Sequence, residues 1–137
     1  MMQQTIQQQR AKYALERVQQ AISNNLDHKE YKSYAASFPA MIHTNGLGQA
    51  AAFFRSKGVN SPAHQALYDL LSDWLCGKCE YAPNQTYRDC ENMLDGIFDK
   101  DMHDYRLAQA EAQALMDWVK KFAKAFMNDG DEEGDRE

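Results

Sequence analysis

Apolar residues recur along most of this chain at intervals of three and four positions, a spacing that places them on one face of an α-helix. The first such segment runs from about Thr5 to Asn24, and the second begins at Asp27, an N-cap residue. The second period continues through Pro39, where the missing backbone donor predicts a kink in the helix and not its end. Its apolar series consists of Tyr31, Tyr34, Ala35, Phe38, Met41 and Ile42.

A tight corner separates this second helix from the third. Asn45 and Gly46 both tolerate a positive φ, and the Asn45 side chain can also cap the helix that follows. The helical period restarts at Leu47 and stops at Gly58. Because Gly46 and Gly48 carry no side-chain bulk, we expect two helices, or a helix and an extended polymer, to approach each other closely here.

Two more helices follow in the middle of the chain. Ser61 and Pro62 are typical of a helix start, with serine as N-cap and proline at the first helical position, and Gly77 ends this helix. Thr86 then opens a short acidic helix, whose apolar positions are Cys90, Met93, Leu94, Ile97 and Phe98.

The last predicted helix is long, from Asp101 or Asp104 to Met127. Its apolar stripe consists of Leu107, Ala108, Ala112, Leu115, Trp118, Val119, Phe122 and Phe126. Glu111 falls on or beside this stripe, and a buried carboxylate needs a partner. We therefore expect Glu111 to form an ion pair with a basic residue of another helix.

Composition agrees with helices throughout. The 137 residues include only seven glycines and three prolines, strong helix formers are plentiful, and β-branched runs are missing. We predict an all-α, compact single-domain bundle of about five to six helices over residues 1–127, and a disordered acidic tail over residues 128–137. The N-terminal residues lack the apolar core of a signal peptide, no apolar run approaches a membrane span, and the three cysteines are an odd number. We expect a cytoplasmic protein with no membrane contact.

Charge is divided along the chain. The formal net charge is −5, but residues 128–137 hold six acidic residues and one basic residue, so residues 1–127 are neutral. Within that body the net charge is +4 over residues 1–58, −6 over residues 59–104 and +2 over residues 105–127. Such a body can bind a polyanion on one side and a protein on the other, although a mixed solvated surface explains the counts equally well.

Three motifs suggest chemistry, and each has a simpler explanation. Residues 46–51 fit the dinucleotide fingerprint G-x-G-x-x-A, but a predicted helix precedes them where the motif requires a strand. Residues 99–104 lack the glycine of a calcium loop. The possible zinc ligands are Cys76, Cys79, Cys90 and His103. Because Cys76 and Cys90 fall on predicted apolar faces, we interpret them as small buried residues and expect no metal and no cofactor.

Two pairs of sequence signatures point to a family. The corner 45–48 leads into 50–58 (Ala-Ala-Ala-Phe-Phe-Arg-Ser-Lys-Gly), and the last helix contains 105–112 (Tyr-Arg-Leu-Ala-Gln-Ala-Glu-Ala) and 118–123 (Trp-Val-Lys-Lys-Phe-Ala). Together with the opening Arg-Ala-Lys-Tyr-Ala at 10–14, these closely resemble the small, all-α subunit of the Cmr complex, the type III-B CRISPR RNA-targeting effector. The resemblance covers roughly residues 5–127.

The resemblance implies a non-catalytic subunit of an antiviral complex. It implies that the chain stacks head to tail with copies of itself, contacts other Cmr subunits, and holds guide RNA and target RNA through phosphate contacts that ignore base identity. Cutting of the target would belong to a neighbouring subunit. The residues we predict to contact RNA are Arg10, Lys12, Arg17, Asn45, Gln49, Arg55, Lys57, Lys120, Lys121 and Lys124.

Other roles for these residues stay open. Arg55 and Lys57, like the three lysines at 120–124, lie in last helical turns, where cations are favourable without any ligand. A helical protein–protein adaptor with no nucleic-acid contact is the main alternative function. A small metal or thiol enzyme that uses the cysteines is the third.

Overall fold

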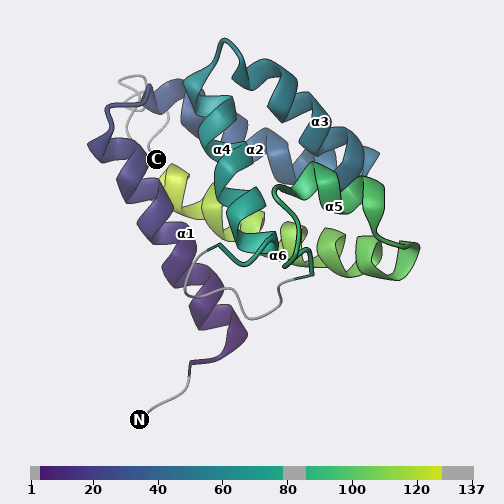
Figure 1. Ribbon diagram of the computed structural model, residues 1–137. Coiled ribbons are helices and arrows are strands. Elements are labelled where there is room, and N and C mark those ends of the chain that lie inside the picture. The colour runs from purple at the N-terminus through teal and green to yellow at the C-terminus, as the bar shows by residue number, and fades with distance from the viewer. Residues whose placement is uncertain (1–3, 79–85, 128–137) are drawn as a thin grey trace.

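The computed structural model describes residues 4–78 and 86–127, and in these residues the chain forms six helices and no strands (Figure 1). This confirms the predicted all-α bundle. The predicted acidic tail and Cys79 lie outside the described residues. The helices are α1 (Ile6–Ser23), α2 (His28–Asn45), α3 (Leu47–Gly58), α4 (Pro62–Leu75), α5 (Met93–Asp99) and α6 (Met102–Phe126).

Helix α2 lies between α3 and α6 and runs antiparallel to both. The corner at Gly46 turns the chain directly from α2 into α3, and the rings of Phe38 and Phe54 stack with centroids 3.9 Å apart. On its other side, the Pro39 carbonyl accepts a hydrogen bond from Gln113 Nε2 of α6 at 3.0 Å. The C-terminal ends of α3 and α6 therefore flank the N-terminal half of α2, at one end of the molecule (Figure 1).

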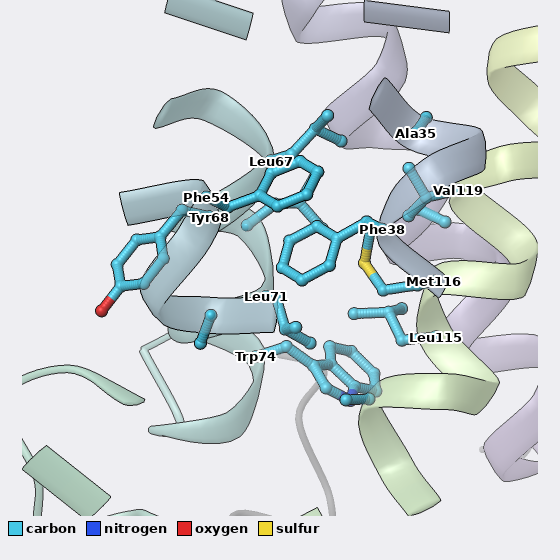
Figure 2. Packing of buried hydrophobic residues seen from close by; sticks show 14 of the residues in the cluster. Ala35, Phe38, Phe54, Leu67, Tyr68, Leu71, Trp74, Leu115, Met116 and Val119 are labelled. Carbon is cyan, nitrogen blue, oxygen red and sulfur yellow. The ribbon is translucent and has the colours of Figure 1, made fainter. Parts of the chain in front are cut away.

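The core forms where α4 and α6 meet this layer. Figure 2 shows Phe38 between Phe54 and Met116, with Leu71 and Trp74 of α4 beneath them. All five side chains are buried, and large apolar groups of this kind contribute about 1.5–3 kcal/mol each on burial. The bundle is thus a rigid body on which surface residues keep fixed positions.

The helix starts that depend on local sequence are confirmed. The side chains of Asp27, Ser61 and Asp101 each accept a hydrogen bond from the backbone N–H three residues later. Helix α2 continues through Pro39, as predicted. The capping box at Thr5 and Gln8 was not predicted, although its T-x-x-Q pattern is visible in the sequence.

The prediction that Asn45 caps the third helix is wrong. Asn45 is the last residue of α2, and the N-cap of α3 is Gly46, whose φ of 90° favours glycine. The orphan N–H groups of Leu47 and Gly48 instead donate to Gln109 Oε1 at 2.8 Å and to Tyr105 Oη at 2.9 Å. Helix α6 therefore caps α3, and the two sequence signatures that carry the family resemblance touch each other.

The short acidic helix begins later than predicted. It starts at Met93 with Asn92 as N-cap, while residues 86–89 form a turn and Cys90 lies in a bend. The turn buries the Tyr87 ring against Gly96, where an added Cβ would lie 2.3 Å from the ring. Helix formation from residue 86 would remove Tyr87 from this site in the core.

The predicted stripe of the last helix is partly wrong. Leu107 is 49% exposed and Phe126 is 53% exposed, whereas Met116 and Ala123 are buried. Helix α6 packs against α1, α2 and α4 at different points along its length, so its buried face does not follow a single straight stripe.

Candidate nucleic-acid interface

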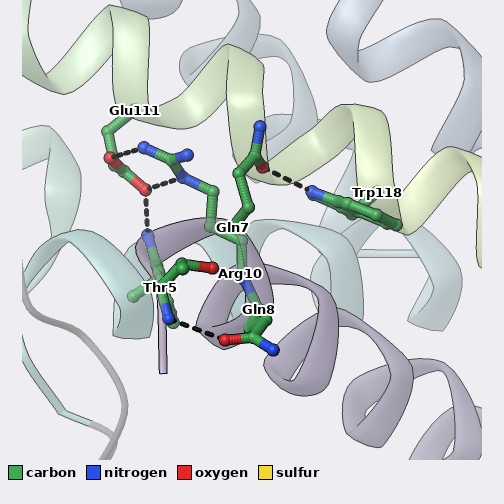
Figure 3. Close-up of polar contacts among 7 residues, drawn as sticks. Thr5, Gln7, Gln8, Arg10, Glu111 and Trp118 are labelled. Carbon is green, nitrogen blue, oxygen red and sulfur yellow. Dashed lines mark hydrogen bonds and ion pairs between the residues drawn. The ribbon is translucent and has the colours of Figure 1, made fainter. Parts of the chain in front are cut away.

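Glu111 is buried, with 4% of its surface exposed, and it has two partners from other helices. Arg10 of α1 donates from Nε to Glu111 Oε2 and from Nη2 to Oε1, both at 2.8 Å, as Figure 3 shows. The indole Nε1 of Trp74 in α4 donates to Oε2, also at 2.8 Å. The prediction that Glu111 pairs with a basic residue of another helix is confirmed.

Arg10 is therefore part of the structure of the bundle. Its two-pronged contact fits the planar guanidinium, and the hydrogen bond to Glu111 raises the pKa of Arg10 above its ordinary value. Removing either member of such a pair would leave a buried charge without compensation. Little of the Arg10 side chain, 13% of its surface, stays open to an RNA phosphate while this contact is formed.

Arg17 lies seven residues, or about two turns, after Arg10 on α1, and it also contacts a carboxylate of another helix. Its Nη2 atom lies 2.5 Å from Asp73 Oδ2 of α4, and its guanidinium lies 5.2 Å from the centroid of the Tyr13 ring. Arg10 and Arg17, two of the three predicted RNA contacts on α1, thus join α1 to α6 and to α4.

A second group of predicted contacts has no such partners. Five exposed side chains take part in no ion pair within the described residues, and they lie in the last turns of α3 and α6. They are Arg55, Lys57, Lys120, Lys121 and Lys124. Because both helices run antiparallel to α2, these cations gather at the same end of the molecule. We call them the basic end.

The other predicted contacts lie elsewhere. Asn45 and Gln49 are located at the corner between α2 and α3, near the start of α6 and far from the basic end. Lys12 is exposed on α1. The structure therefore brings five of the ten predicted residues to one end and separates the rest, and whether any of the ten touches RNA stays a prediction.

The opposite end is acidic and partly apolar. Asp99, Asp101 and Asp95 surround the corner between α5 and α6, where Phe98 is 75% exposed and Met102 is also exposed. Together Phe98 and Met102 offer apolar area on which another protein could pack. We call this corner the acidic end.

A groove between α2, α3 and the start of α4 was not predicted. Its lining includes Tyr34, Phe53, Lys57, Asn60 and His64, from three segments of the chain. No sequence signal joins these residues, because only the antiparallel packing of α3 on α2 brings them together. Burial, and to a smaller extent the nearby Lys57, lower the pKa of His64.

Cys76 and Cys90, the two cysteines within the described residues, show no sign of an activated thiol. Burial raises the pKa of Cys76 to about 11 and also raises the pKa of Cys90, so both thiols are protonated at neutral pH. Within residues 4–78 and 86–127, no group of three or more histidine, cysteine or acidic side chains is placed to hold a metal ion. Cys79, the remaining predicted zinc ligand, is outside these residues.

The contact between Ser61 and His64 belongs to a helix cap. Ser61 Oγ lies 2.8 Å from His64 Nδ1, and it also accepts the backbone N–H of His64 as the N-cap of α4.

None of the helices in the described part of the chain is long and apolar enough to cross a membrane.

Fold and surface together define the class: a small all-helical protein with cations at one end and carboxylates at the other. The chain belongs to the Cas_Cmr5 family of CRISPR-associated proteins, whose family model matches residues 6–126. It is 29% identical over 119 residues to the CRISPR system Cmr subunit Cmr5 of Thermus thermophilus, a match that covers 87% of this chain and 93% of the relative. The family resemblance inferred from the sequence is confirmed.

The fold is also similar to a solved structure. The crystal structure of a CRISPR-associated Cmr5 family protein from Thermus thermophilus matches with a TM-score of 0.73 and 28% sequence identity. The match covers 91% of this chain and all of that one. The bundle in Figure 1 is therefore the fold of this family.

Proposed function

We propose that this chain is the non-catalytic small subunit of a cytoplasmic type III-B CRISPR (Cmr) effector complex that acts in antiviral defence. In this role it contacts other Cmr subunits and holds guide RNA and target RNA through their phosphates. The family membership and the name of the Thermus relative support the assignment to the complex. The thiols protonated at neutral pH agree with a subunit that performs no chemistry.

The observation that carries the RNA contact is the basic end. Five cations gather there, and none is paired with a carboxylate of the described residues. Cations of this kind release counterions from a nucleic-acid backbone and are indifferent to base identity. We propose Arg55, Lys57, Lys120, Lys121 and Lys124 as the main contacts, with Lys12, Asn45 and Gln49 as further ones. Arg10 and Arg17 are secondary because of their ion pairs.

Copies of the chain would stack head to tail. The carboxylates of the acidic end are attracted to part of the basic end of a neighbouring copy, whose other cations face the RNA, and Phe98 and Met102 provide apolar contact area. Different surfaces that join in this way form an open stack. Each added copy raises the effective concentration of phosphate contacts along one RNA.

Filter binding of RNA to the Cmr complex assembled with and without this chain tests the proposal. With the chain, affinity should be higher, and its logarithm should fall more steeply with the logarithm of salt concentration, by about 0.7 for each single-strand phosphate contacted. Changing the RNA sequence should leave this difference unchanged. Equal slopes with and without the chain would contradict the RNA contact.

A protein adaptor is the second candidate, and the exposed Phe98 and Met102 favour it. An adaptor would be required for assembly of the complex, yet removal of its cations would leave RNA affinity and the salt slope as they are. The two candidates therefore differ in how RNA binding responds to variants of the basic end.

A further inference from the structure

The groove between α2, α3 and the start of α4 has a volume of about 820 Å³. This is within the range of sites that hold small molecules, about 300–1,000 Å³. It is adjacent to the basic end, because Lys57 belongs to both. A strand that contacts Lys57 through a phosphate would pass the mouth of the groove.

The lining is free of carboxylates and rich in hydrogen-bonding groups. It holds one ammonium group, one amide and four serine hydroxyls. Two of these hydroxyls, on Ser37 and Ser56, donate to carbonyls of their own helices, so their oxygens keep acceptor capacity toward the groove. An anionic ligand with N–H and carbonyl groups matches such a lining, and an acidic peptide side chain would use only the ammonium group.

Aromatic faces complete the groove. Phe53 is 39% exposed, and Lys57 Nζ lies 5.5 Å from its ring centroid, at the end of a flexible side chain that can move to a phosphate. The Tyr34 and His64 rings stack with centroids 3.8 Å apart, and His64 lies edge-on to Phe53 with centroids 6.1 Å apart, so Phe53 presents the exposed aromatic ring of this cluster. Flat aromatic faces beside a cation are the groups on which proteins stack the bases of single-stranded nucleic acid.

We propose that this groove binds one unstacked base of a single-stranded RNA, with the base stacked on Phe53 and Lys57 on the adjoining phosphate. The inference rests on the proposed RNA contact and goes beyond it, since phosphate contacts alone do not distinguish a single strand from a duplex. Stacking accepts every base, so the site remains tolerant of sequence.

The test is RNA binding by the assembled Cmr complex that contains the full chain, with a single-stranded RNA of about 12 nucleotides that carries 2-aminopurine. The variants are Phe53→Leu, which keeps an apolar side chain without an aromatic face, and Phe53→Tyr, which keeps the face. Phe53→Leu should weaken binding about tenfold and abolish the change in 2-aminopurine fluorescence. Phe53→Tyr and the control Val59→Ala, an exposed apolar residue outside the groove, should behave as the unmodified chain.

Several results would overturn the inference. Unchanged RNA binding by Phe53→Leu would do so, as would an equal loss on an RNA duplex. Normal RNA binding with impaired assembly would show that the groove takes a protein segment. If Lys120→Ala weakens binding and Phe53→Leu does not, the groove proposal fails and the proposed function stands. If the unmodified chain adds nothing to RNA binding, both fail.

Discussion

Arg10 and Arg17 of α1 differ from the basic residues at the C-terminal ends of α3 and α6. Arg10 and Arg17 lie against carboxylates of α6 and α4, with contacts of 2.8 Å and 2.5 Å. The basic end has no ion pair among the described residues and is exposed. Residues with the same formal charge therefore have different surroundings: Arg10 and Arg17 join helices, and the cations of the basic end are exposed.

The cause of the difference is the surroundings of each side chain. Glu111 faces the interior of the bundle, so a cation on the neighbouring helix is drawn to it, and the planar guanidinium meets both of its oxygens. The lysines of α6 lie near its C-terminal end. Within the described residues, they form no ion pair with a carboxylate. Substitutions in the ion pairs of Arg10 and Arg17 should therefore lower stability, whereas substitutions in the basic end should weaken RNA binding.

The largest effect is expected for Glu111→Ala. The substitution leaves the partly buried guanidinium of Arg10 and the buried indole N–H of Trp74 without their partner. The free energy of unfolding should fall by about 3–5 kcal/mol, measured by urea denaturation. Asp117→Ala, an exposed carboxylate of the same helix, is the control and should change it by less than about 0.5 kcal/mol. A loss equal to that of the control would mean that the pair does not hold α1 in place.

The next effect concerns the basic end. The triple variant Lys120→Ala, Lys121→Ala and Lys124→Ala should weaken RNA binding by the assembled complex about tenfold and lower its salt slope by about 2. Stability should fall by no more than about 0.3–1 kcal/mol, because of the three lysines Lys124 alone lies in the last turn of α6, where a cation interacts favourably with the helix dipole. Lys100→Ala, an exposed cation at the acidic end, is the matched control. An equal loss in both variants would show a general effect of charge and no site.

Arg17→Ala should have a smaller effect on stability than Glu111→Ala. The pair with Asp73 is partly exposed, so we expect a loss of about 1 kcal/mol that includes packing of the guanidinium on Tyr13. The loss should shrink at high salt, in contrast to the loss for the buried Glu111 pair. If denaturation at low and high salt gives the same difference, the contribution of Arg17 is packing alone.

The smallest effect is a change in the pKa of His64. Burial lowers this pKa most, and the ammonium group of Lys57 lowers it further. In Lys57→Ala the pKa should move up toward its ordinary value without reaching it, as followed by NMR titration. Because the folded chain prefers neutral His64, its contribution to stability is present above the unfolded pKa of about 6.5 and is lost as pH falls through the lowered value. An unchanged pKa would indicate that the charge of Lys57 is already neutralised.

The local sequence determined most of the helices of this protein. The caps at Asp27, Ser61 and Asp101 depend on a side chain and a backbone group three residues apart, so the pattern alone predicts them. The helical period and the paired signatures around residues 45–58 and 105–123 predicted the fold class and the family, which the family model confirms. The start of α5 was missed, because burial of Tyr87 against Gly96 is not a local property.

Only the tertiary structure decided what the charged and polar residues do. Arg10 and Glu111 are 101 positions apart in the chain, and the groups that cap α3 are 62 and 57 positions away from the N–H groups they accept. The groove that contains Phe53 likewise exists only because α3 folds back on α2. Helix periodicity follows from contacts within one or two turns and can be seen in the sequence, whereas the partner of a buried charge depends on which helices pack together.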